Sequence, residues 1–257
     1  MKIATFNING IRARLPRLLD WLEREKPDVA CLQELKCADE ALPVGDIEAA
    51  GYGAVWHGQK GFNGVAILTR GRSPDLRRIG LPGDPDDSHS RYIEAEVDGL
   101  VIASLYLPNG NPVGTEKFDY KLAWMERLRE HAAELLTTER PVILAGDYNV
   151  VPEDRDVWSA TRMGHDALLQ PETRAAWRRL LYQGWTDALR ALHPREEKLW
   201  TFWDYTAGCW QRDAGFRIDH LLLSPAAADR LQGAAVDKWV RGEEKASDHA
   251  PTWVALN

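Results

Sequence analysis

Short apolar runs separated by polar turns dominate the chain, and their periodicity predicts a mixed α/β protein. Residues 2–9 alternate between apolar and polar side chains, with Ala4 and Phe6 on one face and Asn7 on the other, which is typical of a β-strand. Leucines at helical spacing follow, and an apolar run at residues 29–33 comes after them. This β-α-β order predicts parallel or mixed strand pairing around a crossover helix.

The rest of the chain continues the alternation of strands and helices. Amphipathic patterns predict helices over residues 116–136 and 171–181, and a short helix over residues 187–192. Because no low-complexity stretch or linker interrupts the pattern, we expect residues 1–257 to form a single domain. Further strands are predicted at residues 53–56, 64–68, 91–97, 100–107, 141–146, 217–223, 234–240 and 252–256.

The segment PVILAGDYN, residues 141–149, carries the clearest chemical signal. Its apolar run ends at Gly146, and Asp147 and Asn149 follow on alternate positions, so continued strand geometry would point both side chains the same way. A carboxylate and a carboxamide at a strand end fit a catalytic or metal-binding role, although strand-end aspartates also cap loops. Other predicted strands lead to polar groups in the same manner: Asn7, Glu34, Tyr106, Asp219 and the segment SDHAP at residues 247–251.

Strand ends converge at one edge of an α/β sheet, so we expect these groups to share one site on a solvent-facing rim. Glu34 is the best direct ligand there for a hard divalent cation, with Asn7 and Asp248 completing its shell. Asp147 is placed to deprotonate a water molecule. The chain holds no G-x-S-x-G elbow and no phosphate-binding glycine loop. Metal-assisted attack of water on a phosphate ester is therefore the favoured reaction.

The histidine of the last polar segment is expected to have an acidic partner. Asp248 is its neighbour in sequence, but adjacent side chains point apart, so Asp219 is the expected partner of His249. Such a pair would hold the imidazole in one tautomer and favour its charged form. Tyr106 either hydrogen-bonds a phosphate oxygen or simply ends its strand as an aromatic residue.

Composition sets limits on the class of protein. The chain has 257 residues, 44% of them hydrophobic and eleven of them tryptophan, which is enough for a large core. The formal charge of −7 argues only weakly against a polyanionic partner, because binding follows local patches. No apolar run approaches the roughly 18 residues that cross a bilayer, and no signal-peptide block is present. Three cysteines without a C-x-x-C pair argue against a disulfide framework, so we expect a cytoplasmic protein.

Six segments stand out in order and spacing: FNINGIRA (6–13), LQELK (32–36), GVAIL (64–68), GDYN (146–149), RID (217–219) and SDHAP (247–251). Together they resemble the exonuclease III family of abasic-site endonucleases and 3′-exonucleases, within the endonuclease–exonuclease–phosphatase superfamily. The resemblance runs from residue 2 to the last strand, and the ordered set is specific although no single motif is.

The resemblance implies a fold, a reaction and a partner. The expected fold is a four-layer α/β sandwich of two mixed β-sheets packed face to face with helices outside. The implied enzyme depends on Mg²⁺, with Mn²⁺ as an alternative, and acts in base excision repair. It would cut the phosphodiester 5′ to an abasic site, or remove 3′ nucleotides and 3′ blocking groups. Its partner would be double-stranded DNA with abasic sites or 3′ ends, and it would act as a monomer away from membranes.

The resemblance also assigns residues. The implied catalytic residues are Tyr106, Asp147, Asn149, Asp219 and His249, with Asp147 as general base and His249 on the scissile phosphate. The implied metal-site residues are Asn7, Glu34, Asp147, Asn149, Asp248 and His249. DNA phosphates would be held by Arg12, Lys36, Lys60, Arg91 and Asn109. The abasic-sugar pocket would be walled by Phe202, Phe216 or Trp210, and Ile218, unless these aromatic residues only cap a core.

The chain departs from the family pattern in one segment, and two other functions are compatible with its motifs. Some relatives carry several asparagines after the GDxN turn, whereas residues 159–167 here read SATRMGHDA, which leaves the ratio of endonuclease to exonuclease activity open. A phosphodiesterase or phosphatase of the same fold could act on an inositol phosphate or a sphingolipid instead. A nucleic-acid-binding relative without activity would show gaps among the polar strand ends, and none is missing here.

Overall fold

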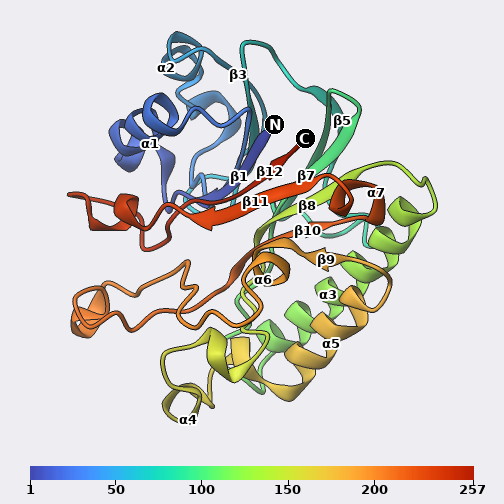
Figure 1. Ribbon diagram of the computed structural model, residues 1–257, viewed down its shortest axis with the longest axis vertical. Helices are drawn as coiled ribbons and strands as arrows, with labels where there is room; N and C mark the ends of the chain where they lie inside the picture. The colour runs from blue at the N-terminus through green and yellow to red at the C-terminus, as the bar shows by residue number, and fades with distance from the viewer.

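Two six-stranded mixed β-sheets pack face to face in the computed structural model, which describes residues 1–257 (Figure 1). In spatial order the first sheet contains β11 (Leu231–Val236), β12 (Thr252–Leu256), β1 (Lys2–Asn7), β2 (Val29–Gln33), β4 (Val65–Arg70) and β3 (Tyr52–His57). The second contains β5 (Asp75–Ile79), β6 (Tyr92–Val97), β7 (Leu100–Tyr106), β8 (Val142–Asp147), β10 (Asp219–Leu223) and β9 (Thr186–Asp187).

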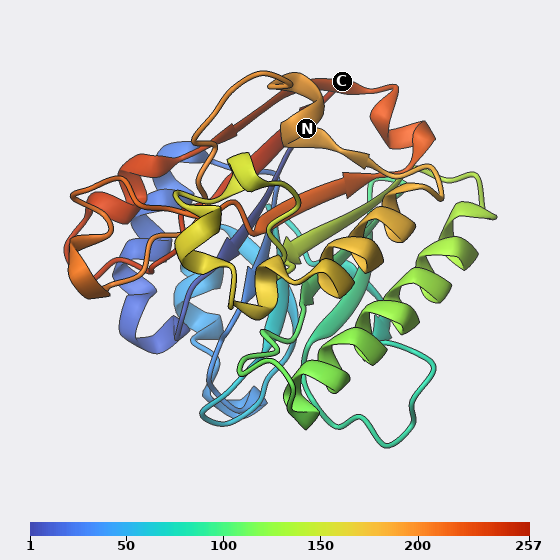
Figure 2. The ribbon, with the colours of Figure 1, turned by 90° about the horizontal axis from the view of Figure 1, so that it is seen from below.

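Helices cover both outer faces of the sandwich. Figure 1 shows α1 and α2 beside the first sheet, and α3 and α5 beside the second. Figure 2 shows α3, in green, and α5, in yellow to orange, lying side by side on the opposite side of the molecule from the blue α1. The predicted four-layer α/β sandwich is therefore confirmed. The helices are α1 (Ile11–Glu25), α2 (Val44–Ala49), α3 (Glu116–Leu136), α4 (Ala160–Met163), α5 (Pro171–Leu181), α6 (Ala188–Leu192) and α7 (Pro225–Ala228).

Three apolar layers hold these parts together, and strand alternation creates them. Along β1, Ile3 lies in the layer between the sheets, whereas Phe6 packs on Trp21 of α1 with ring centroids 5.7 Å apart. On the far side, Leu144 of β8 shares a buried layer with Trp124 of α3. Burying one such side chain contributes about 1.5–3 kcal/mol relative to leaving it exposed. Both faces of the central strands are therefore apolar, as their sequences predict.

Topology brings the polar strand ends to one edge of the sandwich. The pairs β1–β2 and β7–β8 are parallel, so the C-terminal ends of each pair lie together. The strands β10 and β12 run antiparallel to β8 and β1, so their N-terminal ends lie at that same edge. Asp219 is thus the first residue of β10, opposite Asp147 in the register, and not the tip of a strand that begins at residue 217.

Two strand predictions need correction. The strand predicted at 234–240 lies at Leu231–Val236, because the Asp237 carboxylate accepts the indole N–H groups of Trp21 and Trp253 and a 3₁₀ turn follows. The edge strand β5 was missed because all five of its residues are exposed, which leaves no apolar alternation. No helix is long and apolar enough to cross a membrane.

Candidate active site

A cavity of about 500 Å³ opens at the edge where the polar strand ends meet. The structure brings most of the sequence-predicted site residues to its wall. Asn7 and Asp219 lie behind this wall, where they hold other site residues. The predicted residues that line the cavity are Glu34, Tyr106, Asn109, Asp147, Asn149, Phe202, Phe216, Ile218, Asp248 and His249.

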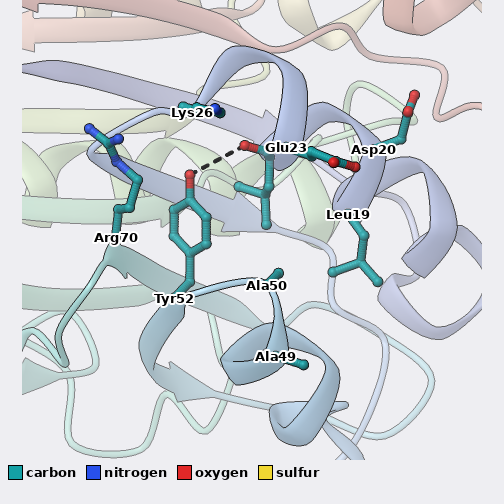
Figure 3. A pocket seen from close by; sticks show the side chains of 9 residues that line it. Leu19, Asp20, Glu23, Lys26, Ala49, Ala50, Tyr52 and Arg70 are labelled. Atoms are coloured by element: carbon teal, nitrogen blue, oxygen red, sulfur yellow. Dashed lines mark hydrogen bonds between the residues drawn. The ribbon is translucent and has the colours of Figure 1, made fainter.

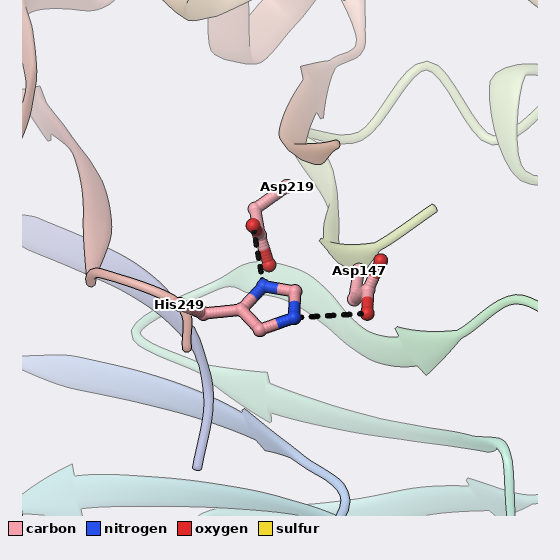
Figure 4. A group of neighbouring side chains, drawn as sticks. All are labelled: Asp147, Asp219 and His249. Carbon is pink, nitrogen blue, oxygen red and sulfur yellow. Dashed lines mark hydrogen bonds and ion pairs between the residues drawn. The ribbon is translucent and has the colours of Figure 1, made fainter. Parts of the chain in front are cut away.

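His249 lies between two carboxylates, as Figure 4 shows. Its Nδ1 is 2.8 Å from Oδ2 of Asp219, and its Nε2 is 3.7 Å from Oδ2 of Asp147. The other oxygen of Asp219, Oδ1, is buried without a hydrogen-bond partner. The pairing of His249 with Asp219 that the sequence suggested is thus the arrangement in the structure. Possible ligand atoms of Asp147, Asp219 and His249 all lie within 4.8 Å of one another.

Burial and the short distances shift both titrating groups strongly. Burial alone would lower the pKa of His249, but the facing carboxylates of Asp219 and then Asp147 raise it to about 10. Burial raises the pKa of Asp147 to about 7, against the opposing effect of His249 and with a further rise from Asp219. At neutral pH the imidazole is therefore charged, and Asp147 is close to its own titration midpoint.

Asn7 joins the two sheets at the site. Its Nδ2 donates to Oε1 of Glu34 at 2.8 Å and to Oδ2 of Asp147 at 2.9 Å. Lys36 pairs with the other oxygen of Glu34 at 2.7 Å. Although burial opposes it, these hydrogen bonds from Lys36 and Asn7 lower the pKa of Glu34, so this carboxylate stays ionised. Asp248 is half-buried and accepts from Nδ2 of Asn9 at 3.0 Å.

The turn after β8 differs from the predicted continuation of the strand. Asn149 has φ 48°, and its backbone N–H donates to Oδ1 of Asp147 at 2.9 Å, so the chain bends instead of alternating. Its side chain still enters the cavity wall. The Nδ2 of Asn149 donates to the Leu107 carbonyl at 2.9 Å, and its Oδ1 accepts from Nδ2 of Asn109 at 3.1 Å. The orientation of this carboxamide is therefore set at both ends.

The expectation of a solvent-facing rim is wrong for the central residues. Asp147 is 1% exposed and His249 is 3% exposed. Asp219 of the antiparallel strand β10 lies opposite Asp147, and the Phe202 ring packs against His249; motif order predicts neither contact. Because both side chains are buried, replacing either residue is expected to change stability.

Tyr106 is half-buried at the end of β7 and keeps its proton. Burial raises its pKa well above the usual value, and the neighbouring Glu34 and Asp147 add to the rise. Arg91 lies 4.8 Å from its ring centroid, and an Arg91 N–H donates to the Tyr106 carbonyl at 3.2 Å. Arg91, which was predicted to hold a DNA phosphate, thus contacts both the ring and the carbonyl of Tyr106.

Three of the four predicted pocket residues stand together. Phe202 lies edge-on to Phe216 with centroids 5.7 Å apart, and its ring is 4.9 Å from that of His249. Trp210 does not line the cavity, because it packs edge-on against Trp203 at 5.0 Å. Further apolar wall residues were not predicted, and three of them, Trp158, Met163 and Leu168, lie in or directly beside the 159–167 segment that was noted only for its lack of asparagines.

Of the predicted DNA-contacting residues, only Asn109 lines the cavity, and the others lie outside its wall. Arg12 is exposed at the start of α1, and Lys60 is exposed in the loop between β3 and β4. Lys36 is exposed beside Glu34. Arg91 and Asn109 line a second cavity of about 640 Å³, which shares Asn109 with the first.

A separate cavity of about 580 Å³ lies between α1 and the α2–β3 segment and contains none of the predicted site residues (Figure 3). Leu19 and Ala49 form part of its apolar wall, and Glu23 and Arg70 add charge. The hydroxyl of Tyr52 donates to the Leu22 carbonyl at 3.5 Å and to the Pro27 carbonyl at 2.9 Å. This polar group is already satisfied, so the cavity shows no chemistry of its own.

Comparison with known proteins agrees with this site. The model of the endonuclease/exonuclease/phosphatase family matches residues 4–249. The chain belongs to this family. Exodeoxyribonuclease III of Haemophilus influenzae is 36% identical over 265 residues, which cover 98% of each chain. The protein is accordingly an exodeoxyribonuclease III-like hydrolase.

Two solved structures have nearly the same fold. A 3′ phosphatase from Neisseria, bound to a product DNA hairpin, superposes with a TM-score of 0.95 at 36% identity, over 100% of this chain and 99% of the other. An AP endonuclease from Archaeoglobus fulgidus gives the same TM-score of 0.95, identity of 36% and coverage of 100% and 99%. Relatives of equal similarity therefore include one named for 3′ ends and one named for abasic sites.

Proposed function

We propose that this protein is a Mg²⁺-dependent DNA repair nuclease that hydrolyses the phosphodiester 5′ to an abasic site and removes nucleotides or blocking groups from 3′ ends of duplex DNA. The observation that carries the proposal is the buried series Asp219, His249 and Asp147 beside a cavity walled by Phe202 and Phe216. An apolar wall next to these groups suits a sugar without its base. Residues 1–257 would act as one domain and one copy, because both sheets contribute to the site.

Asp147 is the general base in this proposal. Its pKa near 7 lets it take a proton from water at neutral pH, whereas Glu34, with its lowered pKa, is a better permanent ligand. Asn149 would orient the water and the phosphate through its carboxamide. His249 would donate from Nε2 to a phosphoryl oxygen, because its Nδ1 is held by Asp219. Tyr106 would donate its hydroxyl proton to the phosphate or the leaving oxygen.

The donor set fits a hard divalent cation. Three carboxylates but only two cationic side chains meet here: Glu34, Asp147 and Asp219 against His249 and Lys36. In addition, Oδ1 of Asp219 has no hydrogen-bond partner. Carboxylate and carboxamide oxygens are the ligands that Mg²⁺ prefers. Bound near Glu34, Asn7 and Asp147, Mg²⁺ would supply Lewis-acid polarisation of a phosphoryl oxygen.

DNA contact would be electrostatic and independent of sequence. Arg12, Lys36 and Lys60 are exposed basic side chains that could pair with DNA phosphates. Affinity should therefore fall as salt rises. Asn109 would contribute a neutral contact at the edge of the cavity.

The test is cleavage of three duplex oligonucleotides, one with a single abasic site, one with a 3′-phosphate end and one intact, with Mg²⁺ and with EDTA. A Mg²⁺-dependent nick 5′ to the abasic site supports the endonuclease, and 3′ trimming without a nick limits the activity to ends. An unchanged set of all three substrates rejects the proposal and favours a different phosphate ester.

A further inference from the structure

Lys121 is a lysine in an apolar position. It lies on the buried face of α3, four residues before Met125 and seven before Leu128, both of which pack in the core. Its side chain is 0% exposed. Burial lowers the pKa of Lys121 to about 7, although Asp147 and Asp166 oppose that change. A buried ammonium group carries a large desolvation cost, so its retention needs a reason.

The partners of Lys121 supply the reason. Its Nζ donates to the Asn149 carbonyl at 2.7 Å and to the Pro108 carbonyl at 3.0 Å. These carbonyls belong to different loops, one after β8 and one after β7. Lys121 forms no ion pair, so its hydrogen bonds go to main-chain carbonyls. One side chain thus connects the two loops that form this end of the site.

The turn after β7 is shaped to fit this lysine. Gly110 has φ 87°, and a Cβ built on it would lie 2.5 Å from Cδ of Lys121. The backbone therefore lies directly against the lysine stem, where a larger residue would displace it. The turn after β7 therefore contacts Lys121 twice, at its ammonium group through the Pro108 carbonyl and at its methylene groups through Gly110.

The same turn orients Asn149. Asn109 donates to Oδ1 of Asn149, and Asn111 donates both to Oδ1 of Asn109 at 2.8 Å and to Oδ1 of Asp166 at 2.9 Å. If the Pro108 and Asn149 carbonyls move apart, the hydrogen bonds that link the side chains of Asn111, Asn109 and Asn149 can no longer all form. Misplacement of a reacting group by about 1 Å can cost on the order of 100-fold in rate.

Resting on the proposed function, we propose that Lys121 is a positioning residue that ties the loops after β7 and β8 together and thereby aims the Asn149 carboxamide into the cavity. Lys121 does not line the cavity, so its effect passes through Asn149. Its loss should slow the chemical step and leave DNA binding nearly unchanged.

The test is a double-mutant cycle with Lys121→Met, which keeps the length of the side chain and removes its charge and donors. On the abasic duplex, we expect kcat to fall about 10- to 100-fold with KM within about threefold of wild type. In the Asn149→Ala background, the same change should lower kcat by less than about threefold, because the group that it positions is gone.

The control is Leu128→Ala, on the same buried face of α3 but in contact with neither carbonyl. We expect its kcat to stay within about twofold of wild type at a temperature well below unfolding. If Lys121→Met does not fold, Gly110→Ala perturbs the same contact from the turn and should lower kcat at least about 10-fold. A folded variant of either kind with wild-type kcat, or full additivity with Asn149→Ala, overturns the assignment. Wild-type protein without cleavage rejects the proposed function as well.

Discussion

The charge of His249 depends on Asp219, and the change Asp219→Asn tests this directly. The pKa of His249 rises from 6.5 to about 10 in the folded protein, and Asp219, 2.8 Å away, is the largest cause of the rise. At about 1.4 kcal/mol per pKa unit, the whole shift corresponds to about 5 kcal/mol in favour of the proton. Because Asp147 and Asp248 also contribute, we expect Asp219→Asn to remove part of the shift, about 1 to 3 units.

The assay is an NMR titration of the imidazole nitrogens in protein kept free of metal, between about pH 6 and pH 10. His249 should keep its proton through neutral pH in wild type and lose it at a clearly lower pH in Asp219→Asn. Cleavage by the variant should then fall more at about pH 8 than at about pH 6, because only the charged imidazole donates from Nε2. A wild-type His249 that titrates near 6.5 refutes the reasoning.

The same shift fixes the direction of the effect on stability. A group with a raised folded pKa stabilises the fold fully below its unfolded pKa, here 6.5, and this stabilisation disappears as the pH rises through about 10.

Asp187→Asn is the matched control for the titration, because Asp187 is a half-buried carboxylate that pairs with Arg217 at 2.7 Å and is not among the groups that shift the pKa of His249. It should leave the His249 titration unchanged.

Three further outcomes follow from the site and the core. Since burial raises the pKa of Asp147 to about 7, a plot of log kcat/KM against pH should rise with unit slope up to about pH 7. Asp147→Asn should remove both the slope and the activity. A flat profile in wild type contradicts the assignment of the base. Glu34→Gln should raise the Mg²⁺ concentration for half-maximal cleavage at least about 10-fold, and an unchanged Mg²⁺ titration would exclude Glu34 as a ligand. Leu144→Ala should lower the free energy of unfolding, measured by urea denaturation, by about 2–5 kcal/mol. The folded fraction of the variant should keep normal activity. A smaller loss of stability would mean that the apolar layer between β8 and α3 is loosely packed.

Continuous apolar runs predicted the central strands well, because a strand that is buried on both faces carries apolar residues at successive positions. The run before Asp147 and the run before Glu34 are of this kind, and both are central strands. The same method missed β5, whose Leu76 and Ile79 are about half-exposed at a sheet edge. Exposure, not lack of pairing, hides an edge strand from sequence analysis.

Most of the residues that the motifs named lie at one cavity, but the motifs did not give the depth at which they lie. Asp219 and His249 precede antiparallel strands, and strand direction in a mixed sheet is a property of long-range pairing that local patterns do not carry. Lys121 was missed for a related reason. A lysine on an apolar helix stripe is a signal, but its partners are main-chain carbonyls, which no motif marks.

If Asp147 is the base, as proposed, its burial means that residues without contact to DNA would help to set the pH range of the reaction. Its carboxylate is desolvated, so its pKa depends on the neighbouring charges and donors, of which His249 and Asn7 lower it and Asp219 raises it. Removing Asn7 would raise this pKa further. Removing Asp219 would take away a carboxylate that raises the pKa of Asp147, but it would also lower the pKa of His249 and so weaken the charge that holds the Asp147 pKa down. In the proposed mechanism the base and the phosphate-binding imidazole would therefore be tuned together, because a substitution at either one changes the charge that the other faces.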